Sequence, residues 1–331
     1  MKTQWKNYLQ TLNAQLDDQG FVTHFEGANF EIGQPFWSDL SHLGIIEISG
    51  EDAQTFLQGQ FTNDVRQVSS EKSQFTAWCN AKGRVLATFY LYKRENAFYL
   101  ILPQDNIAAV LRRLAMYVLR SKVKLREITD EVQIVGLSGD FGKKSGFPEH
   151  KNSVIYQDDM TILCLSENTP KWIVIASTEK LQNFTQHLDK SIIPVGKPVW
   201  ELLEILDGVP QITLSTADAF TPHMLNLQLI EGVNFKKGCY SGQEIVSRTQ
   251  YLGKVKRRIY LAKMAGKCPK MGETLAVEGE ENTAQIVNVA SHPDGFCYVL
   301  AVVSNAAVET NNVRSQDNIP LIFLDLPYVV E

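Results

Sequence analysis

The residues best suited to chemistry lie in one short segment, KKGCYSGQE, at positions 236 to 244. Ser241 and Glu244 have the spacing of a capping box and apolar residues follow them, which predicts that a helix begins just after Ser241. Cys239 would then lie before a helix N-terminus, where unsatisfied amide groups and aligned peptide dipoles favour a thiolate over a thiol. We therefore expect Cys239 to be a working thiol, able to act as a nucleophile or a soft metal ligand. The alternative is a buried structural cysteine in a turn.

The neighbours of Cys239 support the first interpretation. Lys236 and Lys237 place positive charge beside the thiol. Gly238 and Gly242 leave room for the backbone to approach a ligand, or to adopt a positive φ angle. The predicted site motif around the thiol comprises Lys237, Gly238, Tyr240, Gly242, Gln243 and Glu244.

The other cysteines show no comparable pattern. The total is odd and no pair has C-x-x-C spacing, so we expect neither a disulfide framework nor a metal site. Free thiols fit a reducing compartment, and the N-terminus lacks the apolar core of a signal peptide, so we expect a cytoplasmic protein. The cysteines are Cys79, Cys164, Cys239, Cys268 and Cys297.

Length and charge exclude several classes of protein. The chain has 331 residues, more than the roughly 250 that a single core usually reaches, so we expect two or three domains. Its longest apolar run, at 296 to 303, is far shorter than the ~20 residues that a membrane-spanning helix needs. A net charge of -5 argues against a dedicated nucleic-acid binder.

Two groups of basic residues stand out against this acidic background. We interpret the first group as solvated helix and strand faces rather than an RNA-docking patch, and direct contact with tRNA stays open. It consists of Arg112, Arg113, Arg120, Lys122, Lys124 and Arg126. The second group could hold an RNA backbone or the tail of an anionic ligand, but we favour a solvated strand edge that is protected from aggregation. It consists of Lys254, Lys256, Arg257 and Arg258.

The elements that must position these residues are helices packed against antiparallel strands, the α+β class. A hairpin meander followed by a helix with one buried face covers 75 to 120. After Gly253 the sequence changes to short β-type runs, which predict a small β-barrel or sandwich. We therefore expect one region over 1–250, consisting of one or two subdomains and with an exposed loop near 139–153, and a second region over 251–331.

The segment FKKGCYSGQE resembles the K-G-C-Y-x-G-Q-E signature of the YgfZ family, the GcvT-like folate-binding proteins. The resemblance extends over nearly the whole chain, through FLQGQFTNDV at 56–65, CNAKGRV at 79–85 and LLEILDGVPQI at 202–212. It implies a GcvT-like folate-binding region followed by a C-terminal β-barrel. It also implies a folate ligand, tetrahydrofolate or a derivative, and a role in keeping iron-sulfur enzymes active, including tRNA-modifying enzymes such as tRNA methylthiotransferases.

One departure bears on the reaction. In the glycine-cleavage T-protein, a relative with a similar fold, an aspartate takes part in aminomethyl transfer, and the matching position here is Thr88. A hydroxyl cannot replace a carboxylate as an acid-base group or electrostatic stabiliser. We therefore expect an accessory protein with Cys239 as its working thiol. The alternatives are a folate-dependent one-carbon transferase with another substrate, and a folate-binding regulator without thiol chemistry.

An iron-sulfur cluster held by this chain alone is not expected. A [4Fe-4S] cluster usually needs three or four converging thiolates, and here only Cys239 lies in a favourable motif. Cys79 is a second candidate, but beside Trp78 at the end of a β-type run it is expected in the core. We expect at most a transient iron-sulfur species.

The resemblance also points to residues of a folate pocket. Trp200 resembles a family tryptophan that contacts folate, although it could instead pack one face of its helix. A second family tryptophan falls on Leu43, which would supply an apolar wall. Asp207 would hold the hydrogen-bonding edge of the pterin, or else make the turn of LDGVP.

Overall fold

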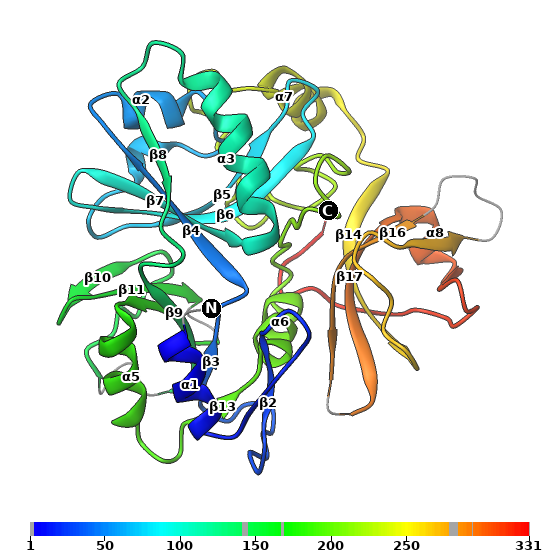
Figure 1. The fold of residues 1–331 in the computed structure, drawn as a ribbon. Coiled ribbons are helices and arrows are strands. Elements are labelled where there is room, and N and C mark those ends of the chain that lie inside the picture. Colours follow the sequence, from blue (N-terminus) through cyan, green and yellow to red (C-terminus); the bar gives the residue numbers. More distant parts are fainter. Residues whose placement is uncertain (1–2, 141–144, 167–168, 278–283, 293, 331) are drawn as a thin grey trace.

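The computed structural model describes residues 3–140, 145–166, 169–277, 284–292 and 294–330. Within these ranges the strands form three larger sheets and one two-stranded hairpin, and helices cover the sheets (Figure 1). This mixture confirms the predicted α+β class. None of the helices in the described ranges has the length and apolarity that a membrane span requires.

The first large sheet is antiparallel throughout. It and its helices consist of β4 (Leu43–Ser49), α2 (Ala53–Gln58), the 3-10 helix η1 (Val65–Gln67), β5 (Gln74–Cys79), β6 (Val85–Arg94), β7 (Ala97–Pro103), α3 (Gln104–Val118) and β8 (Lys124–Glu127). The strand order is β5-β6-β7-β4-β8. Apolar residues of α3 three and four positions apart pack into one core with the sheet and α2, which confirms the helix predicted there.

The second sheet lies beside the N-terminal elements. It and its neighbours consist of α1 (Thr3–Thr11), β1 (Ala14–Leu16), β2 (Val22–Phe25), β3 (Phe36–Asp39), β9 (Gln133–Ser138), β10 (Val154–Gln157), β11 (Met160–Ser166), β12 (Lys171–Ala176), α5 (Thr178–Gln186) and β13 (Ile193–Val195). The order is β10-β11-β12-β9-β3-β13, with β1 and β2 as a separate hairpin. The hydroxyls of Tyr8 and Thr185 hydrogen-bond at 2.8 Å and join α1 to α5.

The prediction of an exposed loop at 139–153 is only partly correct. Residues 141–144 lie outside the described residues, but Phe147 and Pro148 are buried. Trp172 explains this burial. Its ring packs edge-on against Phe147 with centroids 5.7 Å apart, and its Nε1 donates to the carbonyl oxygen of Pro148 at 2.8 Å.

The third sheet is formed by the C-terminal part of the chain. It and its helix consist of β14 (Arg257–Ala265), β15 (Thr274–Val277), β16 (Ala284–Ser291), β17 (Phe296–Ser304), α8 (Asn305–Glu309), β18 (Val313–Arg314) and β19 (Ile322–Leu324). The order is β18-β15-β16-β17-β14-β19. The sheet curls into a half-barrel, so the predicted C-terminal barrel is confirmed in this form.

This sheet corrects the prediction about disulfides, because Cys268 and Cys297 are joined by one. The two residues are 29 positions apart in sequence, but the pairing of β14 with β17 turns the chain back and leaves their Cα atoms 5.4 Å apart. Spacing along the chain did not reveal this proximity. Cys79 and Cys164 are buried free thiols, and Cys239 is an exposed one.

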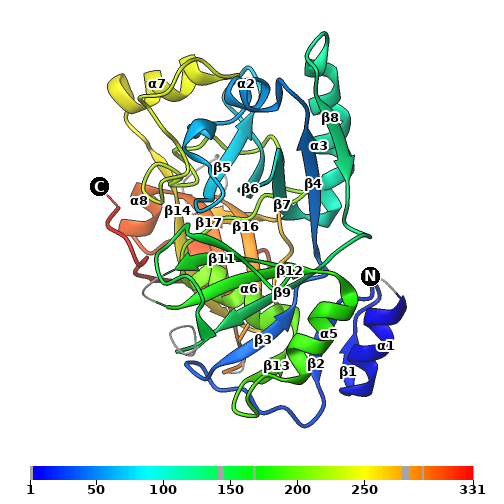
Figure 2. The same cartoon turned by 90° about the vertical axis from the view of Figure 1, so that its left-hand side faces the viewer.

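Two further helices connect the three sheets, α6 (Lys197–Leu206) and α7 (Gln243–Leu252). Helix α6 contacts strands of the second and third sheets and lies centrally between them (Figures 1 and 2). The segment 207–242 contains no helix or strand and crosses to the first sheet. There Asn234 N donates to the carbonyl oxygen of Thr62 at 3.0 Å. Helix α6 thus links the second and third sheets, and the segment that follows it reaches the first sheet.

Candidate functional site

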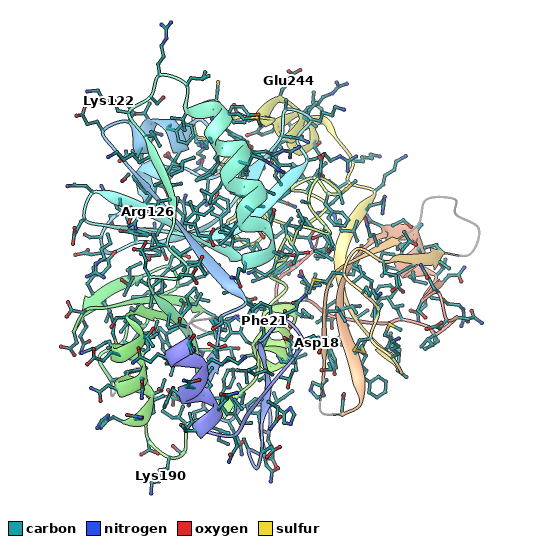
Figure 3. All side chains as sticks on the ribbon, in the orientation of Figure 1. Asp18, Phe21, Lys122, Arg126, Lys190 and Glu244 are labelled. Carbon is teal, nitrogen blue, oxygen red and sulfur yellow. A yellow bond between two sulfur atoms is a disulfide. The ribbon has the colours of Figure 1, made fainter. Side chains whose placement is uncertain are left out.

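A cavity of about 390 Å³ lies beside α6, between strands of the first and third sheets and the turn that joins β1 to β2. Its walls come from the start of β4, the N-terminus of α3, helix α6, the segment that follows α6, and β16. Phe21, on the turn between β1 and β2, also lines it and lies near the centre of the molecule (Figure 3). The volume falls within the range of small-molecule sites.

Helix α6 presents three charged residues to this cavity. Lys197, Glu201 and Glu204 are four and three positions apart, so they lie on one side of the helix, and all three line the cavity. The Lys197 ammonium forms an ion pair with Glu201, with Nζ and Oε1 3.3 Å apart. An otherwise apolar helix therefore brings two carboxyl groups to the wall.

Glu204 is the carboxyl group most affected by its surroundings. Its side chain is 4% exposed, and burial raises its pKa to about 7, against the opposing charge of Lys171. Its Oε1 accepts one long hydrogen bond from Gln211 Nε2 at 3.3 Å. The group changes charge near neutral pH, and its oxygens have capacity for further donors.

His42 and Asp105 add polar groups to the same wall. Burial lowers the pKa of His42 to about 3, so its imidazole is neutral at physiological pH. Within the described chain its Nδ1 has no hydrogen-bond partner. Burial raises the pKa of Asp105, although Leu214 N donates to its Oδ2 at 3.2 Å.

The three folate-contact residues expected from the sequence fall in different places. Leu43 lines the cavity. Trp200 does not, because its ring is fully buried against Gly136, where an added Cβ would lie 2.3 Å from it. Asp207 does not line the cavity either, since its Oδ2 is bound by the buried Lys171 ammonium at 2.8 Å. Contact of Trp200 or Asp207 with folate stays a prediction that this geometry does not support.

Thr88 is fully buried in β6, and its hydroxyl both donates and accepts a hydrogen bond within the fold. Its Oγ1 donates to the carbonyl oxygen of Pro210 at 2.9 Å and accepts from Ile212 N at 3.0 Å. These bonds fix the segment after α6 onto the first sheet. The position therefore has a structural role in this chain.

The helix predicted after Cys239 is confirmed, but its start is corrected. Cys239 is exposed and lies directly before α7, but that helix begins at Gln243 with Gly242 as its N-cap. Gly242 has φ of 80°, and a Cβ there would lie 2.3 Å from the carbonyl oxygen of Asn80. Because a glycine is needed at this contact, Ser241 is displaced from the capping position.

Lys237 has a different role from the one expected. Its side chain is buried, and its ammonium donates to the carbonyl oxygens of Gln58, Phe61 and Asn63 at 2.8, 2.5 and 3.0 Å. Burial lowers its pKa to about 8. All three ammonium protons thus hold the loop onto the segment after α2, and Lys236 is the exposed lysine beside the thiol.

The remaining motif residues lie around the hydrogen bonds of the Lys237 ammonium or follow them in the chain. The buried ring of Tyr240 lies 5.0 Å from the Lys237 ammonium, and Gln243 Nε2 donates to the carbonyl oxygen of Gly238 at 3.4 Å. Glu244 is exposed in the first turn of α7 and lies at the edge of the molecule, well away from Phe21 at the cavity (Figure 3). The structure therefore separates the motif from the cavity.

No three or more His, Cys, Asp or Glu side chains in the described ranges are grouped so that they could hold a metal ion. Cys79, the second candidate thiolate, is buried in the core as expected, and burial raises its pKa.

Sequence reasoning missed most of the cavity wall. The signal for it was present in KPVWELLEIL, where charged residues recur on one side of an apolar helix. His42, Asp105 and Gln211 had no such signal, because they come from separate segments that meet only in the fold.

Comparisons with known proteins agree with this architecture. The family model of the GCVT N-terminal domain matches residues 36–142. The tRNA-modifying protein YgfZ of Colwellia psychrerythraea is 30% identical over 311 residues, which are 91% of this chain and 95% of that protein. The glycine cleavage system aminomethyltransferase T of Bartonella henselae has a similar structure, with a TM-score of 0.76 at 14% identity over 98% of this chain and 96% of that one.

Proposed function

The chain belongs to the YgfZ family, and from this premise we propose that it binds tetrahydrofolate or a derivative in the cavity beside α6 and serves tRNA modification. The observation that carries the proposal is the buried carboxyl of Glu204 in a cavity of suitable size. The 2-amino group and ring N-H of a pterin form a pair of adjacent donors. An ionised carboxylate can accept both, and such charge-assisted pairs are the stronger kind of hydrogen bond.

Other groups of the cavity suit the rest of a pterin. Leu43 and Phe21 provide apolar surface for the flat ring, and neutral His42 provides a polar atom without adding charge.

We further propose that the protein acts as an accessory factor for iron-sulfur enzymes, including enzymes of tRNA thiolation, with Cys239 as its working thiol. The exposure of Cys239 supports this role, because a partner can reach the thiol without rearrangement of the fold. A single thiolate suits transient contact with an iron-sulfur species or with a partner protein better than storage of a cluster. We propose the cytoplasm as the compartment for this work, although the Cys268–Cys297 disulfide removes the argument from free thiols.

An aminomethyltransferase of the T-protein type is disfavoured by Thr88, whose hydroxyl is occupied within the fold. A transferase with another substrate, and a folate-dependent regulator without thiol chemistry, are the outcomes that a test must separate.

The test is a deletion strain complemented with the wild type, Glu204→Gln or Cys239→Ser. We expect the wild type to restore tRNA thiolation and iron-sulfur enzyme activity, and both variants to fail. Purified Cys239→Ser protein should still bind 5-formyltetrahydrofolate, whereas Glu204→Gln should bind it weakly. Full rescue by Cys239→Ser would assign the role to the folate cavity alone, and turnover of tetrahydrofolate with an amine donor would favour the transferase.

A further inference from the structure

Helix α7 exposes apolar side chains on the face that points away from the fold. Ile245, Tyr251 and Leu252 are 40%, 68% and 84% exposed, whereas Val246 is buried. Ile245 and Leu252 are seven positions apart, which places them on one face of the helix, two turns from each other. Figures 1 and 2 both show α7 at the periphery of the molecule. Single exposed apolar residues are common on surfaces, but several large ones on one short helix indicate an interaction surface.

The inner face and both ends of α7 are attached to the rest of the protein. Val246 packs into the core, and the Tyr251 ring packs edge-on against Phe235, with centroids 6.2 Å apart. Near the N-terminus of the helix, Ile245 abuts the turn between β5 and β6, because a Cβ added to Gly83 would lie 3.0 Å from the Ile245 Cβ. The exposed face is therefore held in place before any partner arrives, which lowers the entropic cost of binding.

Positive charge surrounds this face. The exposed cations are Lys82, Lys236, Arg248, Lys254 and Lys256, and none of their charged groups forms a hydrogen bond or ion pair with another described residue. Lys254 and Lys256 lie between α7 and β14 rather than in the strand. Of the nearby carboxylates, Glu244 is exposed on α7, and Asp218 accepts a hydrogen bond from Asn80 Nδ2 at 2.5 Å. The surface is thus basic on a chain of net charge -5, so it attracts an acidic partner.

The same surface includes the exposed thiol. Cys239 lies three residues before Gly242, the N-cap of α7. The ten residues of the helix extend about 15 Å from there. Glu244, in the first turn of α7, lies at the outer edge of the molecule in Figure 3. A protein segment that lies along α7 therefore has one end beside the Cys239 thiol.

The side chains favour a protein over RNA as the occupant. Unpaired RNA bases bind mainly by stacking on aromatic rings, and Tyr251 is the only aromatic residue of α7. Ile245 and Leu252 are aliphatic and suit the apolar side chains of a protein segment. The guanidinium of Arg248 suits a carboxylate, which it can bind with two parallel hydrogen bonds.

We propose that the outer face of α7 binds an acidic segment with apolar side chains on the iron-sulfur enzyme that this protein serves, and thereby places that enzyme beside Cys239. This inference rests on the proposed accessory function. Tyr251 and Leu252 make the apolar contacts, and Arg248 binds a carboxylate of the partner.

The test measures the binding of purified tRNA methylthiotransferase to the protein by biolayer interferometry. We expect wild-type protein to bind, and Tyr251→Ser/Leu252→Ser and Arg248→Glu each to bind at least about tenfold more weakly. Added KCl should weaken the wild-type complex. Ile32→Ser is the matched control, because Ile32 is 51% exposed on the segment between β2 and β3, and this variant should bind as the wild type does. Thermal unfolding and folate affinity should be the same for all four proteins.

The docking surface would be overturned if wild-type protein did not bind the enzyme, or if both α7 variants bound it as tightly as the wild type. Binding of unmodified tRNA, or of a second copy of this chain, through the same residues would also overturn it, because the occupant would then be of another kind. Rescue of the deletion strain by Cys239→Ser tests the thiol separately. Full rescue would refute the role of the thiol, and the binding measurement would still decide whether α7 docks the enzyme.

Discussion

The α6 cavity and the Cys239 loop use burial in opposite ways. In the cavity the buried group is the one proposed to bind a ligand, because burial brings the pKa of Glu204 close to neutrality. In the loop the buried group is Lys237, whose ammonium is saturated by three carbonyl oxygens, and the reactive thiol is outside. The buried carboxyl of Glu204 thus tunes ligand binding, whereas the buried ammonium of Lys237 holds a backbone segment in place.

The largest effect should come from the loop's buried lysine. Lys237→Met leaves three carbonyl oxygens without their donor, so we expect the free energy of unfolding to fall by about 4 kcal/mol. Urea denaturation measures this loss. Lys236→Met, at the exposed neighbour, should change it by less than about 0.5 kcal/mol. Equal effects of the two substitutions would show that the Lys237 ammonium does not hold the loop.

The buried carboxyl of the cavity should appear in the pH dependence of stability. The folded pKa of Glu204, about 7, lies above its ordinary value of 4.5, so the folded state retains a proton that the unfolded state loses. The stability that this proton contributes is present below pH 4.5 and is lost as the pH rises toward 7, by up to about 3 kcal/mol. Glu204→Gln should flatten this part of the profile, and parallel profiles for variant and wild type would contradict the assigned burial.

A smaller effect should separate the two glycines of the loop. Gly242→Ala forces a side chain into a positive φ and against the Asn80 carbonyl oxygen, so we expect a loss of about 2 kcal/mol. Gly238 has open space around it and no positive φ, so Gly238→Ala should be nearly neutral. Thermal unfolding of both proteins gives the comparison, and a neutral Gly242→Ala would contradict the close approach.

The smallest effect should be that of the thiol itself. Because Cys239 is exposed, Cys239→Ser should change the free energy of unfolding by less than about 0.5 kcal/mol and leave folate affinity unaltered. A marked loss of stability would mean that the cysteine is structural.

Local sequence patterns predicted the helices and strands, but contacts between distant segments determine the geometry of the candidate site. The three-and-four spacing of apolar residues predicted α3, and the short β-type runs after Gly253 predicted a small β domain, which is the curled third sheet. The capping pattern placed the N-cap at Ser241, one residue before its actual position at Gly242, because the close Asn80 carbonyl oxygen requires a glycine there. Such a contact joins residues 162 positions apart and leaves no trace in the local sequence.

Lys237 and Trp200 also have partners that the local sequence did not predict. Charge beside a thiol suggested that Lys237 acts on Cys239, but its ammonium points to carbonyl oxygens of the segment 58–63. An aromatic ring near a folate site suggested that Trp200 contacts the ligand, but Gly136 of the second sheet leaves space that the ring fills. In both cases the residue type indicated which interactions the side chain could make, and the packing of distant segments determined which of them it makes.

Glu204 is proposed to bind the pterin when its carboxyl group is ionised, and calorimetry with 5-formyltetrahydrofolate at pH 8 and pH 6 measures this dependence. With a pKa of about 7, wild-type protein should bind about tenfold more weakly at pH 6 than at pH 8. Glu204→Gln should bind weakly at both pH values, whereas Glu179→Gln, an exposed change on α5, should follow the wild type. A Glu204→Gln protein with wild-type affinity and wild-type pH dependence would show that Glu204 does not bind the pterin.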